Sequence, residues 1–193
     1  MDSLRIVFSS ITILSALMFL GFIVLLHFLP NKFNPVTNTV SDYEARLSSK
    51  YYFVKAGTPL AGALSSLSLA VVLVTNIRIA SMSVVLLLTI SSICRFLLIL
   101  FPTDITGRPA TKIGRMHLIF AVTSFTCIAF AAGNFQMTVL DKILGQTVVI
   151  TAILLLLGFL PQLKRIFGLL ERIYLFSSIV WLIVVGSELL FKT

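Results

Sequence analysis

Four side chains carry the chemistry of an acid–base or metal-binding site: Ser41, Asp42, Asp104 and His117. Asp104 follows directly on the end of one apolar run, and His117 lies one turn inside the next. An imidazole titrates near neutral pH and can serve as an acid, a base or a metal ligand. The pair therefore predicts a polar site in the hairpin 101–117, where two apolar runs meet.

Five further polar residues could bind a substrate at the same site: Asn34, Asn38, Arg95, Glu171 and Arg172. An arginine is suited to an anionic group, because its planar fork donates paired hydrogen bonds. Structural alternatives stay open. Ser41 and Asp42 could cap a helical turn. Arg95 could extend to the nearer membrane surface or pair with a carboxylate inside the protein. Glu171 and Arg172 also suit the start of a helix at the membrane interface.

The composition places these residues in a membrane protein. Of 193 residues, 58% are hydrophobic and 11% are charged, whereas about a quarter are charged in soluble proteins. The mean hydropathy is +1.07. The net charge of +8 comes from Lys and Arg that lie mainly between the apolar runs, beside the expected lipid phosphates,. We therefore expect membrane lipid as a partner and no nucleic acid.

Six apolar runs are long enough to cross a bilayer, which takes about 20 residues. We predict an all-α integral membrane protein, a bundle of six transmembrane helices in a single membrane domain over residues 1–193, since helices satisfy their own backbone in lipid. The expected helices cover residues 6–29, 52–74, 80–101, 113–134, 143–160 and 173–191. The turn formers that follow Pro30 predict the longest loop. Six spans place both termini on the same side of the membrane.

All nine candidate residues belong to the loops after the first, third and fifth spans, or to the turns beside them. We expect Asp42, Asp104 and His117 to lie within about the 10 Å diameter of a helix, with Arg95, Glu171 and Arg172 in or near the cluster. Lys and Arg are more numerous in these loops than in those on the other side: Lys32, Arg46, Lys50, Arg108, Lys112, Arg115, Lys164, Arg165 and Arg172, against Arg5, Arg78, Lys142 and Lys192. The positive-inside rule then predicts a cytoplasmic site in a cell membrane.

Three groups of short motifs occur in order along the chain. They are His27-Phe28-Leu29-Pro30 with Asn38-Thr39-Val40-Ser41-Asp42-Tyr43, then Phe101-Pro102-Thr103-Asp104 with Gly114 and His117, then Gly168-Leu169-Leu170-Glu171-Arg172. Together they resemble the domain of unknown function 998 family of multi-pass membrane proteins over nearly the whole chain. Glu44 departs from that pattern, which has a glycine after the Ser-Asp-aromatic triplet. The resemblance implies a membrane protein and implies no activity.

A looser similarity is to the alkaline ceramidase-like membrane hydrolases, which hold zinc through histidines, an aspartate and a serine at one membrane face. Ser41, Asp42, Asp104 and His117 are similar to that inventory. Those enzymes supply three histidines, whereas this chain has only His27 and His117. A catalytic zinc usually has three protein ligands and a water. The similarity thus implies a zinc cofactor held by His117, Asp104 and Asp42, while the residues alone leave the metal unknown.

Three functions remain open from the sequence. The first is an enzyme, a hydrolase or transferase that acts on a lipid or lipid-linked head group. The second is a protein that binds or transports a lipid or small molecule, and the third is a non-catalytic membrane partner protein. A transport path would place polar residues along the spans, but the mid-span positions are mostly apolar or small. This distribution favours a surface pocket, open toward lipid, for a ligand with an apolar tail and an anionic head.

Overall fold

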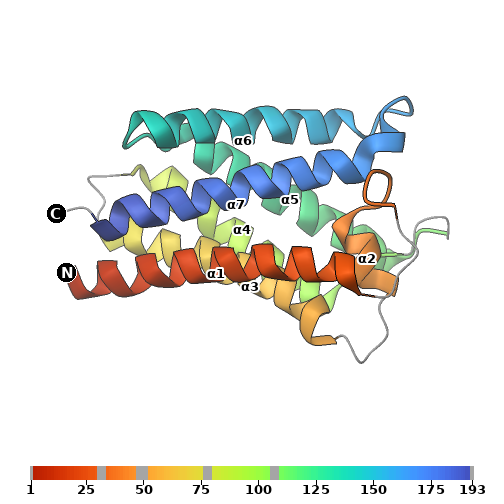
Figure 1. Ribbon diagram of the computed structural model, residues 1–193, viewed down its shortest axis with the longest axis horizontal. Helices are drawn as coiled ribbons and strands as arrows, with labels where there is room; N and C mark the ends of the chain where they lie inside the picture. Colours follow the sequence, from red (N-terminus) through yellow and green to blue (C-terminus); the bar gives the residue numbers. More distant parts are fainter. Residues whose placement is uncertain (1, 30–33, 47–51, 76–79, 105–108, 192–193) are drawn as a thin grey trace.

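The computed structural model describes residues 2–29, 34–46, 52–75, 80–104 and 109–191 (Figure 1). Its elements are α1 (Asp2–Phe28), α2 (Val40–Arg46), α3 (Tyr52–Thr75), α4 (Met82–Leu100), α5 (Lys112–Asn134), α6 (Val139–Leu157), the 3-10 turn η2 (Lys164–Ile166) and α7 (Phe167–Phe191). Six helical segments have the length and composition to cross a membrane: α1, α3, α4, α5, α6, and η2 together with α7. The prediction of an all-α protein with six membrane-spanning helices is therefore confirmed.

The six long helices form a closed ring. Each packs against the next along the chain, from α1 through α3, α4, α5 and α6 to α7, and α7 packs against α1. The start of α1 and the end of α7 lie at one end of the bundle, and α2 lies at the other (Figure 1). We call the end that holds α2 and η2 the site end. The side of the membrane that each end faces stays a prediction.

Small residues on α3 allow its neighbours to approach closely, as they do where helices associate in lipid. A Cβ added at Gly57 would lie 2.5 Å from the ring of Phe22 on α1, too close for a real contact. The hydroxyl of Ser65 donates to the backbone carbonyl of Thr12 on α1 at 3.1 Å. These contacts bury most of α3, and they fix the helices that carry the site.

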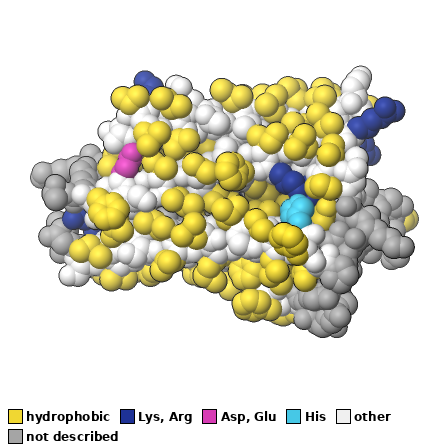
Figure 2. Space-filling model, in the orientation of Figure 1, with side chains coloured by type: hydrophobic (Ala, Val, Ile, Leu, Met, Phe, Trp, Pro, Cys, Tyr) yellow, Lys and Arg dark blue, Asp and Glu magenta, His cyan; other side chains and the backbone are white. Residues whose placement is uncertain are grey.

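The flank of the bundle is covered with hydrophobic side chains, and charged groups lie mostly toward the ends (Figure 2). Leu14, Ile93, Phe130 and Ile150 are all more than half exposed on four different helices. Such a surface would drive association in water, but it is the expected surface against lipid tails. Trp181, Tyr174 and Phe135 are fully buried inside.

Several helix ends differ from the predicted ones: α1 begins at Asp2 instead of residue 6, and α6 ends at Leu157 instead of residue 160. Two other differences have a local cause. The short helix α2 lies within the predicted loop because Thr39 and Asp42 cap it reciprocally. The pair Thr138 and Asp141 starts α6 in the same way, at Val139 instead of residue 143,. In addition, α7 begins at Phe167 instead of residue 173. Glu171 and Arg172 therefore lie within the helix and do not head it.

Candidate functional site

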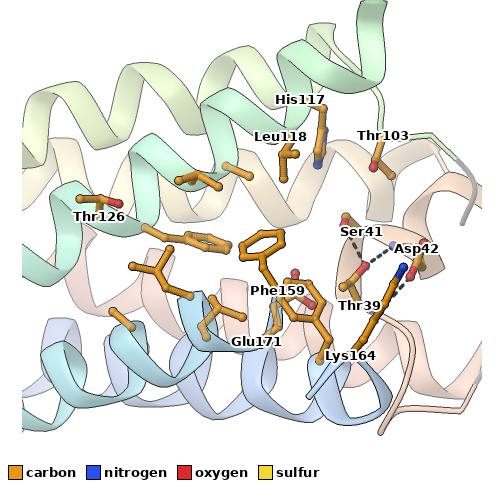
Figure 3. Close-up of a pocket in the computed structure, with 18 of the residues that line it drawn as sticks. Thr39, Ser41, Asp42, Thr103, His117, Leu118, Thr126, Phe159, Lys164 and Glu171 are labelled. Carbon is orange, nitrogen blue, oxygen red and sulfur yellow. Dashed lines mark hydrogen bonds between the residues drawn. The ribbon is translucent and has the colours of Figure 1, made fainter. Parts of the chain in front are cut away.

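A cavity of about 1040 Å³ opens between α5 and α6 and extends to the site end. Its wall within the bundle is apolar and comes mainly from α5 and α6: Leu118, Ala121, Val122, Phe125, Ala129, Phe130, Val149, Ala152, Ile153, Leu155 and Leu156. Its other end is polar and is lined by Thr37, Asn38, Thr39, Ser41, Asp42, Thr103, Asp104, His117, Lys164 and Glu171. Figure 3 shows His117 on α5 facing the group of Thr39, Ser41 and Asp42 across this space.

The cavity exists because α5 and α6 meet closely only at the end away from α2. There a Cβ added at Gly145 would lie 2.2 Å from the carbonyl oxygen of Ala132, so the glycine permits backbone contact. Toward the site end the two helices separate (Figure 1). Small side chains such as Ala121 and Ala152 line the gap without filling it. The space is therefore set by the helix packing itself.

Asp42 holds the first turn of α2 and lines the cavity as well. Its Oδ2 accepts from the backbone N–H of Thr39 at 3.1 Å, and its own N–H donates to Oγ1 of Thr39 at 3.0 Å. The hydroxyl of Ser41 lies 3.0 Å from the same Oγ1. The capping role that the sequence left open for Asp42 is therefore present. Both side chains still reach the polar end of the cavity.

Glu171 connects α7 to α2 across the polar end. It is buried, and its Oε2 accepts from the backbone N–H of Val40. Nearby Glu44 is partly buried on α2. Burial raises the pKa of the Glu44 carboxyl to about 8; the charge of Glu171 adds to this rise, and a hydrogen bond from Thr58 opposes it,. The polar end of the cavity thus adjoins two glutamates in addition to Asp42 and Asp104, and Glu44 is neutral for the most part at pH 7.

Asp104 fastens the hairpin between α4 and α5. Its Oδ2 accepts from the backbone N–H of Thr111 at 2.7 Å, and its Oδ1 accepts from the Thr111 hydroxyl at the same distance. These two bonds hold the pKa of the Asp104 carboxyl below its usual value, with smaller contributions from Arg115 and His117. Gly114 is required here, since an added Cβ would lie 1.9 Å from Oδ2. Asp104 therefore lines the cavity with both oxygens already engaged.

His117 has one ring nitrogen, Nε2, that is free to bind a proton in the cavity. The side chain is buried, and Nδ1 lies 2.7 Å from the carbonyl oxygen of Phe101. A carbonyl can only accept, so Nδ1 carries the hydrogen and Nε2 keeps a lone pair in the neutral ring. His117 can therefore take a proton from a group bound in the cavity.

Arg172 lies outside the cavity lining and holds the loop before α2. Its Nη1 donates to the carbonyl oxygens of Pro35 at 2.8 Å, Asn38 at 2.6 Å and Gly168 at 2.8 Å. Its Nε donates to Nε2 of His27 at 3.0 Å. Two of the three nitrogens of the guanidinium predicted to bind a substrate are thus engaged by backbone oxygens and His27. Its Cζ lies 5.1 Å from the ring centroid of Tyr43, and its buried Nη2 has no hydrogen-bond partner among the described residues.

Of the two asparagines predicted to bind a substrate, Asn38 lines the cavity and Asn34 does not. Asn34 is exposed and lies outside the cavity lining, and its Oδ1 accepts from the N–H of Val36 at 2.8 Å within a turn. Asn38 lines the cavity, and its Oδ1 accepts from the N–H of Asn34 at 3.2 Å. Asn34 therefore serves the turn, whereas Asn38 remains beside a ligand space.

Arg95 takes neither of the two positions that the sequence left open. It does not extend to the membrane surface, because it is only 2% exposed inside the bundle. Its Nε donates to the Ser124 hydroxyl at 3.1 Å, and its Cζ lies 5.0 Å from the ring centroid of Phe19. Within the described part of the chain no carboxylate pairs with it, and its Nη2 has no hydrogen-bond partner. An unpaired buried charge costs several kcal/mol.

The residues do not fit the zinc site that the looser similarity implies. Across the described ranges, no three His, Cys, Asp or Glu side chains come close enough together to hold a metal ion. Asp104 already accepts two hydrogen bonds from Thr111. His117, Asp104 and Asp42 line one cavity but do not form a ligand set.

Comparison with known proteins decides the family. The sequence model described as Protein of unknown function (DUF998) matches residues 13–188, which is most of the chain. The chain belongs to the DUF998 family. No curated protein and no solved structure matches this DUF998 chain, so the similarity to ceramidase-like hydrolases gains no support.

Two groups at the polar end of this DUF998 protein were missed by reasoning from the sequence. Lys164 lines the cavity from η2, and it resembled any other interfacial lysine. Glu44 stands out in the sequence only because a glycine is expected after the Ser-Asp-aromatic triplet. It places a carboxyl group on α2 beside Glu171.

Proposed function

We propose that this DUF998 protein binds an amphiphile from the membrane, with the apolar chain between α5 and α6 and the polar head at the site end. The observation that carries the proposal is the division of the 1040 Å³ cavity into an apolar wall and one polar end. Small-molecule sites usually measure about 300 to 1000 Å³ and have apolar walls with a few polar groups that orient the ligand. A membrane lipid is the nearest ligand of that kind.

A chain-end photoprobe tests where the amphiphile lies. The probe is dodecanol with a diazirine at the end of its chain, added to the purified full chain in glyco-diosgenin, a detergent without an alkyl chain. We expect cross-links in the peptides that hold Val122, Ala129 and Val149, and we expect excess unlabelled dodecanol to suppress them. Exposed positions on α4, such as Ile90 and Ile93, serve as the control surface. Cross-links spread over all outer faces in proportion to exposure, and insensitive to competition, would contradict the proposal.

A second candidate is acid–base chemistry on the bound head group, such as hydrolysis, and it is favoured by His117. The lone pair on Nε2 belongs to a ring held in place by Phe101, beside a cavity that could hold a head group and water,. Incubation of the protein with mixed membrane lipids and mass analysis of products tests it. Products formed by the natural protein but not by His117→Gln, with dodecanol binding unchanged, are the expected result. Equal turnover by both, or none by either, would remove this candidate and leave binding.

We also propose that the site end faces the cytoplasm, on the basis of the excess of Lys and Arg in the loops after the odd spans. A single cysteine tests this orientation, since the two natural cysteines are buried. Val36→Cys lies on an exposed turn at the site end, and Gln136→Cys is exposed between α5 and α6 at the other. In intact cells an impermeant maleimide should label only the cysteine at 136. Labelling at 36 instead would reverse the orientation.

A further inference from the structure

A smaller chamber of about 60 Å³ adjoins the cavity. The two spaces share Ser41, His117 and Glu171 among their lining residues. Arg95 and Glu44 line the chamber but not the cavity. A water needs roughly 10–15 Å³ of such space, so the chamber has room for roughly four to six water-sized groups. A phosphate, sulfate or carboxylate group is of that size.

No described carboxylate pairs directly with Arg95, although Glu44 and Glu171 line the same chamber. Its guanidinium meets Ser124, the ring of Phe19 and the backbone at Gly62, all of them uncharged. Its Nη2 donates to none of the residues that the structure describes, although the side chain is 98% buried. A buried charge inside a membrane protein is normally paired with an opposite charge. The side chain thus supplies a cation and a free donor beside a polar space.

We propose that the chamber is a site for a small oxyanion, in which Arg95 holds the phosphate, sulfate or carboxylate on the head of the bound amphiphile. This inference rests on the proposed function, because the chain attached to that head would occupy the adjoining cavity. It assigns the head group to an acidic class and gives Arg95 the role of the anion-binding residue.

The acids of the chamber are compatible with an anion. Burial keeps the pKa of Glu44 near 8, so at pH 7 most of its carboxyl groups are neutral and can donate a hydrogen bond to an oxyanion,. Glu171 already accepts the N–H of Val40, which disperses its charge. The competing arrangement is a set of waters that bridge Arg95 to these acids. That arrangement gives no preference for an anionic head.

Lys164 is the other described Lys or Arg that borders either space, and it is a weaker candidate. It is exposed on η2 at the mouth of the cavity. A charge near water is screened and attracts an anion less than a charge buried in the bundle. Lys164 therefore provides the matched control for Arg95.

The test compares two probes with the same chain, dodecyl phosphate and dodecanol, in equilibrium binding to the full chain in glyco-diosgenin, a detergent without an alkyl chain. We expect the natural protein to bind the phosphate at least about tenfold more tightly than the alcohol. Arg95→Gln should reduce that ratio to less than about threefold without weakening dodecanol binding. Lys164→Gln should keep most of the ratio. If Arg95→Gln does not fold, Gly62→Ala replaces it, because its added Cβ would lie 2.2 Å from Nη1 of Arg95 and displace the guanidinium.

Each other outcome has a definite meaning. Equal binding of the two probes to the natural protein, or a preference lost in Lys164→Gln and kept in Arg95→Gln, would overturn the oxyanion site while amphiphile binding stands. Failure of both probes to bind would overturn the proposed function and the oxyanion site with it. Inorganic phosphate, added as a competitor of dodecyl phosphate, distinguishes a site for a free oxyanion from a site for the head group of an amphiphile. Competition that depends on Arg95 would support a site for free oxyanion, and lack of competition would support the head group.

Discussion

At the scale of single residues, the polar end of this protein is built from side chains that hold structure and border a ligand space at the same time. Asp42 caps α2, Asp104 fastens the hairpin before α5, and both line the cavity. His117 and Glu44 can still exchange protons. Nε2 of His117 has a free lone pair, and the pKa of the Glu44 carboxyl is raised to about 8. Changes at the first two residues should therefore affect folding, and changes at the other two should affect ligand or proton binding.

The raised pKa of Glu44 predicts how the stability of the protein depends on pH. Its folded-state pKa of about 8 exceeds its ordinary value of 4.5, so the folded protein binds a proton that the unfolded chain releases between these values. The contribution of Glu44 to stability is greatest below pH 4.5 and is lost as the pH rises to about 8. Glu44→Gln keeps a neutral side chain at every pH. The thermal midpoint of the natural protein should fall relative to this variant between pH 5 and 8, and parallel curves would contradict the shift.

At the scale of the elements, α2 is held by contacts from distant parts of the chain. The carboxylate of Glu171 accepts the N–H of Val40, and Arg172 binds carbonyl oxygens on both sides of the turn before α2. A seven-residue helix is too short to be stable alone. Its position over the cavity therefore depends on α7.

The Arg172 contacts predict a local loss of order when they are removed. Arg172→Met keeps an unbranched apolar stem but removes the guanidinium that donates to the carbonyl oxygens of Pro35 and Asn38. The loss of these charged hydrogen bonds costs roughly 1.5–3 kcal/mol. Hydrogen exchange in residues 34–46 should become faster, while exchange in α3 and α4 stays unchanged. Arg165→Met on exposed η2 is the control, with no change expected. Unaltered exchange in Arg172→Met would show that the loop is held by other contacts.

The six membrane-spanning helices could be predicted from the sequence. Unpaired backbone groups are costly in lipid, and an apolar run of this length satisfies them by forming a helix. The parity of the spans also indicated that Asp42, Asp104 and His117 would lie toward one end. A surface pocket open toward lipid was predicted, but its position between α5 and α6 was not, since it depends on the close contact of Gly145 with Ala132 and on the separation of the two helices beyond it. A cap by Ser41 and Asp42 was among the alternatives left open by the sequence, but short helices like α2 need tertiary contacts that no local pattern shows.

At the scale of the whole molecule, the ring of six helices provides a rigid frame with one gap. The frame is apolar outside and tightly packed at α3, and the gap between α5 and α6 ends among polar groups. The gap reaches the membrane-spanning part of α5 and α6 at Ala129 and Val149, so a ligand could enter from lipid without opening the bundle. This architecture suits a protein that takes an amphiphile from its own membrane.

Native mass spectrometry of the protein released from its membrane tests that claim most directly. We predict one bound amphiphile per chain, retained in Ile150→Phe, which adds a ring to the exposed face of α6, and lost in Ala152→Phe, which adds the same ring inside the cavity. Both variants should fold, since one side chain faces lipid and the other enters open space. A natural protein without any bound amphiphile, or equal occupancy in the two variants, would contradict a ligand site between α5 and α6.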